Sequence, residues 1–432
     1  MTTVENAQPA PAGSAAKVLR MPITNIHDGS AYSVQLAIGS QGVVANLMLD
    51  TGSGTLAVES SAYDGTGDTA LNTTTLAQWI TYAGGGWAGP VITTDVSFGG
   101  PDASVILQGA PIAIAVVQQG SLGTVNGVLG LAFAGLNPAF DFAGHLAQKG
   151  APATTHPWPF GTGNWDRFVA SFEKLVQVHA VPQQPVTPCF DLLQSQAGVA
   201  NKFAFHTLRS SVSLRGGDPA SIASDPLNNG VFVLGGGEEQ ADLYQGEFVT
   251  VAVVHDLFYN VGLVSVRVGA LPAVAAAGLQ VQDQQTLASN AIVDSGSEWL
   301  ALAADVYQAV LAGLKQLNPA FAQAVQEAQA NQSVAANTLN LSAWPDICFA
   351  LSGVNGEDVA LTVSPETYWQ TDFPAAGQAA FKISGPLASA NQSNLGLPLL
   401  NNYYTIFDRS QGAQGVIRFA PIQPPAAWAI SA

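Results

Sequence analysis

Positive charge and cysteine are scarce in this sequence. It has 13 Lys and Arg residues against 30 Asp and Glu residues, a formal net charge of −17, and charged residues make up only 10% of the chain. Without a cluster of Lys or Arg there is no basic face for a nucleic acid, so we expect no nucleic-acid partner. The acidic excess fits either a solubility device or a protein that limits positive self-repulsion at low pH.

The two cysteines, Cys189 and Cys348, are too few for a disulfide-rich scaffold, and each lies in an apolar run that favours a buried thiol over a bridge. The six histidines are scattered and no H-E-x-x-H occurs, so we expect no metal and no cofactor. Met1–Arg20 lacks the apolar segment of a signal peptide or a spanning helix. We therefore expect no membrane association and favour the cytoplasm, with export left open.

Glycine and proline are plentiful, at 44 and 25 of 432 residues, and 48% of the residues are apolar. Short apolar runs separated by Gly, Asn or Asp predict an all-β class of fold, mainly strands with a few short helices. The expected helices are Trp165–Val178, Asp305–Leu317 and Ala320–Ala330. The expected strands include Tyr32–Ile38, Val43–Leu49, Thr55–Val58, Trp79–Tyr82, Val91–Phe98, Ser104–Leu107, Phe203–Thr207, Val231–Leu234, Tyr403–Asp408 and Gly415–Phe419.

The length exceeds what one hydrophobic core usually supports, so we expect two domains. We divide the chain into a loose Ala/Pro/Gly-rich arm at 1–17, a first lobe at 18–240 and a second lobe at 241–432. Within the first lobe, residues 135–165 are rich in Gly and Pro, and we expect them to form an irregular surface insertion.

A short motif occurs twice. Leu47–Ser53 reads LMLDTGS and Ala291–Ser297 reads AIVDSGS, and each copy is followed later by a Leu-Gly step. Two related lobes are the natural explanation. Three apolar residues precede each aspartate, which places Asp50 and Asp294 at the ends of buried strands, where a lone charge is costly. Two such carboxylates brought together can share one proton, an arrangement that activates water for hydrolysis.

The residues that follow each aspartate suit this chemistry. Thr51 and Ser295 can lock the two loops together through their hydroxyl groups. Two glycines leave backbone space for a substrate, and two serines can donate to the carboxylates and hold their geometry. These four residues are Gly52, Gly296, Ser53 and Ser297.

With these motifs the chain resembles the pepsin family of aspartic peptidases, in order from about residue 30 to residue 422. Ile80–Gly89 is similar to the flap hairpin that closes over substrate in that family, and Tyr82 matches the flap tyrosine. Four further segments are similar to family segments: Gly127–Ala132, Val231–Gly236, Trp344–Phe349 and Tyr403–Arg409.

The resemblance implies a bilobal fold, with two pseudo-two-fold-related β lobes and an active-site cleft between them. It implies an aspartic endopeptidase, a monomer that acts at acidic pH on peptides or unfolded proteins with hydrophobic residues flanking the cut. The lack of the usual disulfides and propeptide resembles the bacterial branch of the family. Substrate contacts are implied in the flap and the apolar pockets, at Tyr82, Ala83, Gly84, Met48, Val125 and Val128.

The chain departs from the family pattern at three positions. Ala57 stands where members usually carry a tryptophan that is hydrogen-bonded to the flap tyrosine, and either Trp79 or Trp87 is a candidate substitute. Ala83 replaces the usual flap glycine, so only its backbone amide is available for binding. Asn394 stands where an apolar residue is usual before the second Leu-Gly step.

Other functions have weaker support. Gly84–Gly89 matches the dinucleotide-binding pattern G-x-G-x-x-G, but strand-like residues follow it where that motif needs a helix. No G-x-S-x-G occurs, which disfavours a serine hydrolase. The alternative that stays open is a catalytically weak or inactive binding or inhibitor protein on the same fold, since a fold does not dictate an activity.

Overall fold

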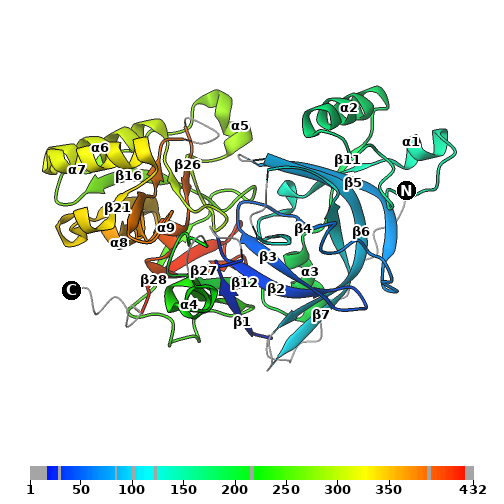
Figure 1. Ribbon diagram of the computed structural model, residues 1–432, viewed down its shortest axis with the longest axis horizontal. Coiled ribbons are helices and arrows are strands. Elements are labelled where there is room, and N and C mark those ends of the chain that lie inside the picture. The colour runs from blue at the N-terminus through cyan, green and yellow to red at the C-terminus, as the bar shows by residue number, and fades with distance from the viewer. Residues whose placement is uncertain are drawn as a thin grey trace.

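Strands make up most of the regular structure in both halves of the chain (Figure 1). This computed structural model describes residues 17–27, 31–82, 85–99, 103–120, 124–214, 218–386 and 391–423. The predicted arm, apart from Lys17, and the flap positions Ala83 and Gly84 lie outside the described residues. The mainly β class is confirmed, because the short apolar runs between turn residues do form strands.

The first half builds a sheet around the first aspartate motif. Strand β3 pairs antiparallel with β2 and parallel with β9, and β9 pairs antiparallel with β4. A long hairpin, β5–β6, extends the sheet. The strands are β1 (Leu19–Thr24), β2 (Ser33–Ile38), β3 (Val43–Asp50), β4 (Leu56–Glu59), β5 (Asn72–Tyr82), β6 (Gly85–Gly99), β7 (Ser104–Ala115), β8 (Val117–Gln119), β9 (Gly127–Gly130), β10 (Pro138–Asp141), β11 (Gln183–Pro185), β12 (Lys202–His206) and β13 (Asn229–Leu234).

The second half repeats the arrangement around its own motif. Strand β18 lies parallel to β26, and β26 pairs antiparallel with β19, just as β3, β9 and β4 do. The strands are β14 (Val249–Ala252), β15 (Asn260–Val261), β16 (Leu263–Val268), β17 (Val274–Ala275), β18 (Ala291–Val293), β19 (Leu300–Ala301), β20 (Val334–Ala335), β21 (Ile347–Ser352), β22 (Asp358–Val363), β23 (Trp369–Thr371), β24 (Gln378–Phe381), β25 (Ile383–Ser384), β26 (Ser393–Leu395), β27 (Tyr403–Asp408) and β28 (Val416–Pro421).

A shared stretch of sheet joins the two halves, in the order β1-β13-β12-β27-β28-β14. Strands β12 and β27 are antiparallel, with Phe203 opposite Phe407, and these two rings stack at a centroid distance of 5.0 Å. Both rings belong to one buried apolar core that contains side chains from both halves. Figure 1 shows this sheet between the two halves. The lobe boundaries at residues 18, 240 and 241 stay predictions.

Three helices form where apolar spacing predicts them. α2 has the predicted bounds. The Asn164 side chain caps its first turn, because it accepts hydrogen bonds from the backbone amides of Asp166 and Arg167. α6 begins one residue earlier than predicted, and α7 extends one residue further than predicted at each end. The helices are α1 (Ala143–Gln148), α2 (Trp165–Val178), α3 (Cys189–Ala197), α4 (Pro219–Ser224), α5 (Gln284–Leu287), α6 (Ala304–Leu317), α7 (Pro319–Asn331), α8 (Pro365–Tyr368) and α9 (Leu397–Leu400).

The prediction of an irregular surface insertion at 135–165 is wrong for its first part. β10 pairs with β5, and α1 follows it directly. Ala139 and Phe142 are fully buried, because these apolar side chains cover the flank of the sheet despite the glycines and prolines around them. Residues 149–164 contain no helix or strand.

Cys189 and Cys348 are both free and buried, as the apolar runs around them predict. Burial raises the pKa of the Cys189 thiol to about 12, so this thiol stays protonated and unreactive at neutral pH. In the part of the chain that the structure describes, no helix is both long and apolar enough to cross a bilayer. Nor do three or more His, Cys, Asp or Glu side chains gather there at distances suited to a metal ion.

Candidate active site

The two motif aspartates lie at the ends of matching buried strands. Asp50 is the last residue of β3, and Asp294 follows β18 directly. Each backbone is fixed by the neighbouring parallel strand. The Leu131 amide donates to the Asp50 carbonyl at 2.8 Å, and the Asp294 amide donates to the Leu395 carbonyl at 3.1 Å. The apolar strands thus bring both carboxylates to defined positions.

Four hydrogen bonds tie the two loops together through the residues after the aspartates. The Thr51 hydroxyl donates to the Val293 carbonyl at 3.0 Å and accepts from the Ser295 amide at 2.8 Å. The Ser295 hydroxyl donates to the Leu49 carbonyl at 2.8 Å and accepts from the Thr51 amide at 3.1 Å. The arrangement is reciprocal, so each loop holds the other in place, as the sequence predicts for these two residues.

The glycines bring the two carboxylates face to face. A Cβ added to Gly52 would lie 2.8 Å from Asp294 Oδ1, and a Cβ added to Gly296 would lie 2.5 Å from Asp50 Oδ1. Each glycine amide also donates to the aspartate of its own loop, at 2.7 Å and 2.9 Å respectively. The opposite carboxylate therefore fills the space beside each glycine. The sequence predicts instead that this space is left for a substrate.

Burial and mutual repulsion favour one shared proton on this pair. Asp50 is only 5% exposed, and burial, followed by the negative charge of Asp294, raises the pKa of Asp50 to about 7. The Ser53 hydroxyl and the Gly52 amide act in the opposite direction. At pH values below 7 the pair can therefore hold one proton and one charge, the state that can both accept and donate a proton.

Parts of this chain are similar to known proteins. Residues 220–421 match the model of the family described as eukaryotic aspartyl protease. The fold is pepsin-like. A beta-secretase from Strongylocentrotus purpuratus is 25% identical over 249 residues, which cover 55% of this chain and 45% of that protein. The chain thus spans less than half of this relative, and the family match includes the loop of Asp294 but not that of Asp50.

The prediction that the serines after the aspartates donate to the carboxylates is wrong for Ser297. The Ser297 hydroxyl does not donate to Asp294. It donates to the Trp299 carbonyl at 3.0 Å and accepts from the Trp299 amide at 3.4 Å, because a serine hydroxyl readily bonds to the backbone two residues further on. Ser297 therefore shapes the turn of the second loop.

Asn394 contacts the pair directly, and its role is not evident from the sequence. Its side-chain amide nitrogen donates to Asp294 Oδ2 at 2.7 Å. The only sequence signal is a polar residue in a short buried strand, just before the Leu-Gly step.

Beyond Asp294, an ion pair between the partly exposed Glu298 and a fully buried lysine anchors the second loop. Glu298 accepts from Lys382 Nζ at 2.7 Å and also from the Ser211 hydroxyl. The Lys382 side chain has no exposed surface, and its Nζ lies 4.4 Å from the ring centre of Trp299 and 4.1 Å from that of Phe373. Burial lowers the pKa of Lys382, while the Glu298 carboxylate acts against that change. An ion pair whose ammonium group lies over two aromatic rings thus holds the loop in place.

Trp87, not Trp79, is the hydrogen-bond partner of Tyr82. Its indole N–H donates to the Tyr82 hydroxyl at 3.3 Å, and it packs against Ala57 in a buried cluster. A small residue at position 57 thus leaves room for an indole from β6. Trp79 instead packs edge-on against Phe172 of α2, at 6.2 Å between ring centroids. Burial and the charge of Asp50 raise the pKa of Tyr82, so its hydroxyl stays protonated.

We expect Trp87→Phe to lower kcat/KM for a peptide about 5- to 10-fold, because Tyr82 loses the donor that fixes its hydroxyl. Tyr82→Phe should have a similar effect, and the double variant should be no worse than either single one. Steady-state kinetics on the four proteins measures this coupling. Trp79→Phe is the matched control and should leave kcat/KM within about twofold. If Tyr82→Phe left turnover unchanged, this hydrogen bond would have no role.

The expected apolar pocket residues are less open than the sequence suggests. Val128 has no exposed surface, because β9 lies between β3 and β4, and Val125, which precedes β9, is 3% exposed. In this conformation neither side chain is available to a ligand. Met48 is half-buried and keeps some surface. Substrate contacts by these residues stay predictions, as do those of Ala83 and Gly84.

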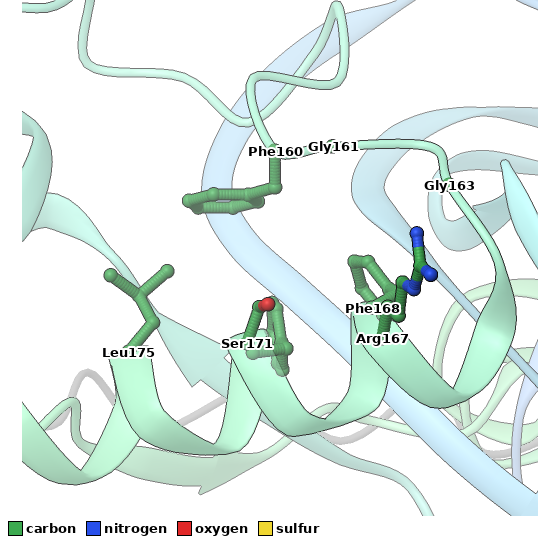
Figure 2. Close-up of a pocket in the computed structure, with 8 residues that line it drawn as sticks. Phe160, Gly161, Gly163, Arg167, Phe168, Ser171 and Leu175 are labelled. Atoms are coloured by element: carbon green, nitrogen blue, oxygen red, sulfur yellow. The ribbon is translucent and has the colours of Figure 1, made fainter.

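A separate cavity of about 340 Å³ lies beside α2 (Figure 2). Figure 2 shows Phe160 on the loop above the helix, with Phe168, Ser171 and Leu175 rising from α2 below it. None of the predicted site residues lines this cavity. Trp158 and Phe160 pack against the buried Phe172, so these aromatic residues cover the core rather than the aspartate pair.

Proposed function

We propose that this protein is an aspartic endopeptidase in which Asp50 and Asp294 activate a water molecule. The observation that carries the proposal is the facing pair of carboxylates on two loops tied by Thr51 and Ser295. The match of residues 220–421 to an aspartyl protease family supports it.

The geometry suggests a direct hydrolytic mechanism. The ionised aspartate takes a proton from water as the water oxygen attacks the peptide carbonyl carbon. The protonated aspartate gives its proton to the carbonyl oxygen, which yields a neutral tetrahedral diol. Collapse of the diol breaks the C–N bond, the amide nitrogen takes up a proton, and the second hydroxyl proton returns to the pair. No covalent bond to the protein forms, and the flap residue Tyr82 bounds the reaction space.

We propose unfolded proteins or peptides with hydrophobic residues beside the cut as substrates. We also propose acidic pH as the working range, with activity extending toward neutrality, because the raised pKa of Asp50 keeps a proton on the pair up to about pH 7. A monomeric state and a place in the bacterial, disulfide-poor branch stay predictions; the relative above is a eukaryotic protein.

The direct test is incubation with a denatured protein between about pH 3 and pH 8. We expect cleavage at low and intermediate pH, loss of cleavage with an apparent pKa near 7, and inhibition by a peptide carrying a tetrahedral hydroxyl group in place of the scissile carbonyl. Mass spectrometry of the products should show hydrophobic flanking residues, and charged ones would contradict the proposed preference. Tight binding of the inhibitor with no cleavage at any pH would favour the inactive binding protein instead.

A further inference from the structure

The two halves of the active site differ at one equivalent position. In the first half, Val128 on β9 lies beside Met48 on the parallel strand β3. In the second half, Asn394 on β26 lies beside Ile292 on the parallel strand β18. Each of these positions comes two residues before the glycine of a Leu-Gly step. The repeated structure therefore places a valine next to one aspartate motif and an asparagine next to the other.

The asparagine makes the two carboxylates chemically unequal. Asn394 Nδ2 lies 2.7 Å from Asp294 Oδ2, while the other oxygen of Asp294 accepts from the Gly296 amide at 2.9 Å. An amide nitrogen can only donate, so both contacts favour a charged carboxylate. Asp50 has the matching contact from the Gly52 amide at 2.7 Å, and the Ser53 hydroxyl also favours its charged form. The Val128 side chain cannot donate, so the Asn394 amide is the contact that has no counterpart at Asp50. Asp50 is also the less exposed of the two, a setting that disfavours charge.

The surroundings of the Asn394 carbonyl oxygen agree with an amide whose nitrogen points toward Asp294. It is buried and has no hydrogen-bond partner among the described residues. The contact with Asp294 is thus the interaction that orients the amide, and the carboxylate selects the nitrogen as its partner. The carbonyl oxygen is thus a buried hydrogen-bond acceptor beside the pair that no described residue satisfies.

We propose that Asn394 is a positioning residue that keeps Asp294 as the ionised member of the pair and leaves the shared proton on Asp50. Its catalytic meaning rests on the proposed function. Asp294 is then the base that takes the proton of water, and Asp50 is the acid that protonates the substrate carbonyl. The raised pKa of Asp50 agrees with this division of roles.

The other ionisable groups nearby leave this division unchanged. Tyr82 faces Asp50 and stays neutral, because burial and the charge of that carboxylate raise its pKa. Glu298 lies on the loop of Asp294, but Lys382 balances its charge at 2.7 Å. The asymmetry therefore comes mainly from the contact with Asn394 and from the burial of Asp50.

Carbon-13 NMR of protein labelled at the aspartate carboxyl carbons tests the placement of the proton without any activity. At about pH 6, we expect the shift of an ionised carboxylate for Asp294 and that of a protonated acid for Asp50. The Asp50→Asn and Asp294→Asn variants assign the two signals. In Asn394→Val the two shifts should converge, because the proton is then shared more evenly. Val128→Asn, which puts an amide on the other side, is the matched control and should also reduce the difference.

The pH profile of kcat/KM provides the catalytic readout. In Asn394→Val the acidic limb should move up by about 1 to 2 pH units, since loss of a donor to a charged group makes the base harder to ionise. A thermal melt checks that each variant is folded. The proposal is overturned if Asp50 carries the ionised signal, or if Asn394→Val changes neither the NMR shifts nor the acidic limb. An asymmetric pair in a wild-type protein that cleaves no peptide would instead contradict the proposed function alone.

Discussion

Asp50→Asn and Asp294→Asn are each expected to lower kcat/KM for peptide cleavage by about 10⁴-fold or more, because either change removes a group that moves a proton in the transition state. The two variants should lose nearly the same activity, and the double variant should lose little further, since the pair acts as a unit. Cleavage of a fluorogenic hydrophobic peptide at about pH 5 measures this. Asp218→Asn, a change at an exposed aspartate that caps α4, is a matched control and should keep full activity.

The same Asp50→Asn variant should be more stable than the wild type at alkaline pH. The pKa of Asp50 is raised from 3.8 to about 7 in the folded protein, so folding favours its protonated form. The contribution of protonated Asp50 to the free energy of unfolding is fully present below about pH 4 and is lost as the pH rises to about 7. We expect Asp50→Asn to recover on the order of 4 kcal/mol at about pH 8 and almost nothing at about pH 3. Urea unfolding at both pH values decides this, and an equal effect at both would contradict the raised pKa.

Glu298→Gln is expected to destabilise the protein by about 3 to 5 kcal/mol, because it leaves the ammonium group of Lys382 buried without its counter-charge. The side chain of Lys382 has no exposed surface, whereas that of Glu298 is 26% exposed, so the ammonium group depends on the protein for its counter-charge. Adding Lys382→Met should recover most of the loss, since an apolar side chain of similar length suits the rings of Trp299 and Phe373.

Chemical denaturation of the two single variants and the double variant at about pH 7 measures this coupling. The exposed pair of Arg20 and Asp242, at 2.7 Å, provides the matched control. Asp242→Asn should cost at most about 1 kcal/mol, because both groups remain solvated. A double variant as unstable as Glu298→Gln would show that the cost arises from packing and not from the buried charge.

Local patterns predicted much of this fold and the identity of the pair. The run of Phe168, Phe172 and Leu175 marks α2 because its period is helical, and three apolar residues before each aspartate mark the strands that carry them. The first part of the 135–165 segment was missed because its glycines and prolines hide a short strand, whose partner, β5, lies far away in sequence. Pairing between distant segments leaves no local signal.

The finer parts of the site depend on such pairing. Whether Trp79 or Trp87 reaches Tyr82 depends on which face of the hairpin each occupies, and on the space that Ala57 leaves on a different strand. The contact of Asn394 with Asp294 requires two parallel strands about a hundred residues apart. A sequence shows that a residue departs from a pattern. The residues that it contacts, which determine its role, are known only from the fold.

The shared sheet determines how late in synthesis the two halves of this protein can assemble. Strand β12 is completed by β27, and β27 by β28, so the sheet that joins the halves lacks its last strands until the ribosome has passed residue 421. The loops of Asp50 and Asp294 depend on each other for their hydrogen bonds, and their halves are held together by that sheet. A nascent chain therefore carries both aspartates long before it can bring them together. The order of the strands along the chain thus delays the assembly of the aspartate pair until β28 has been synthesised.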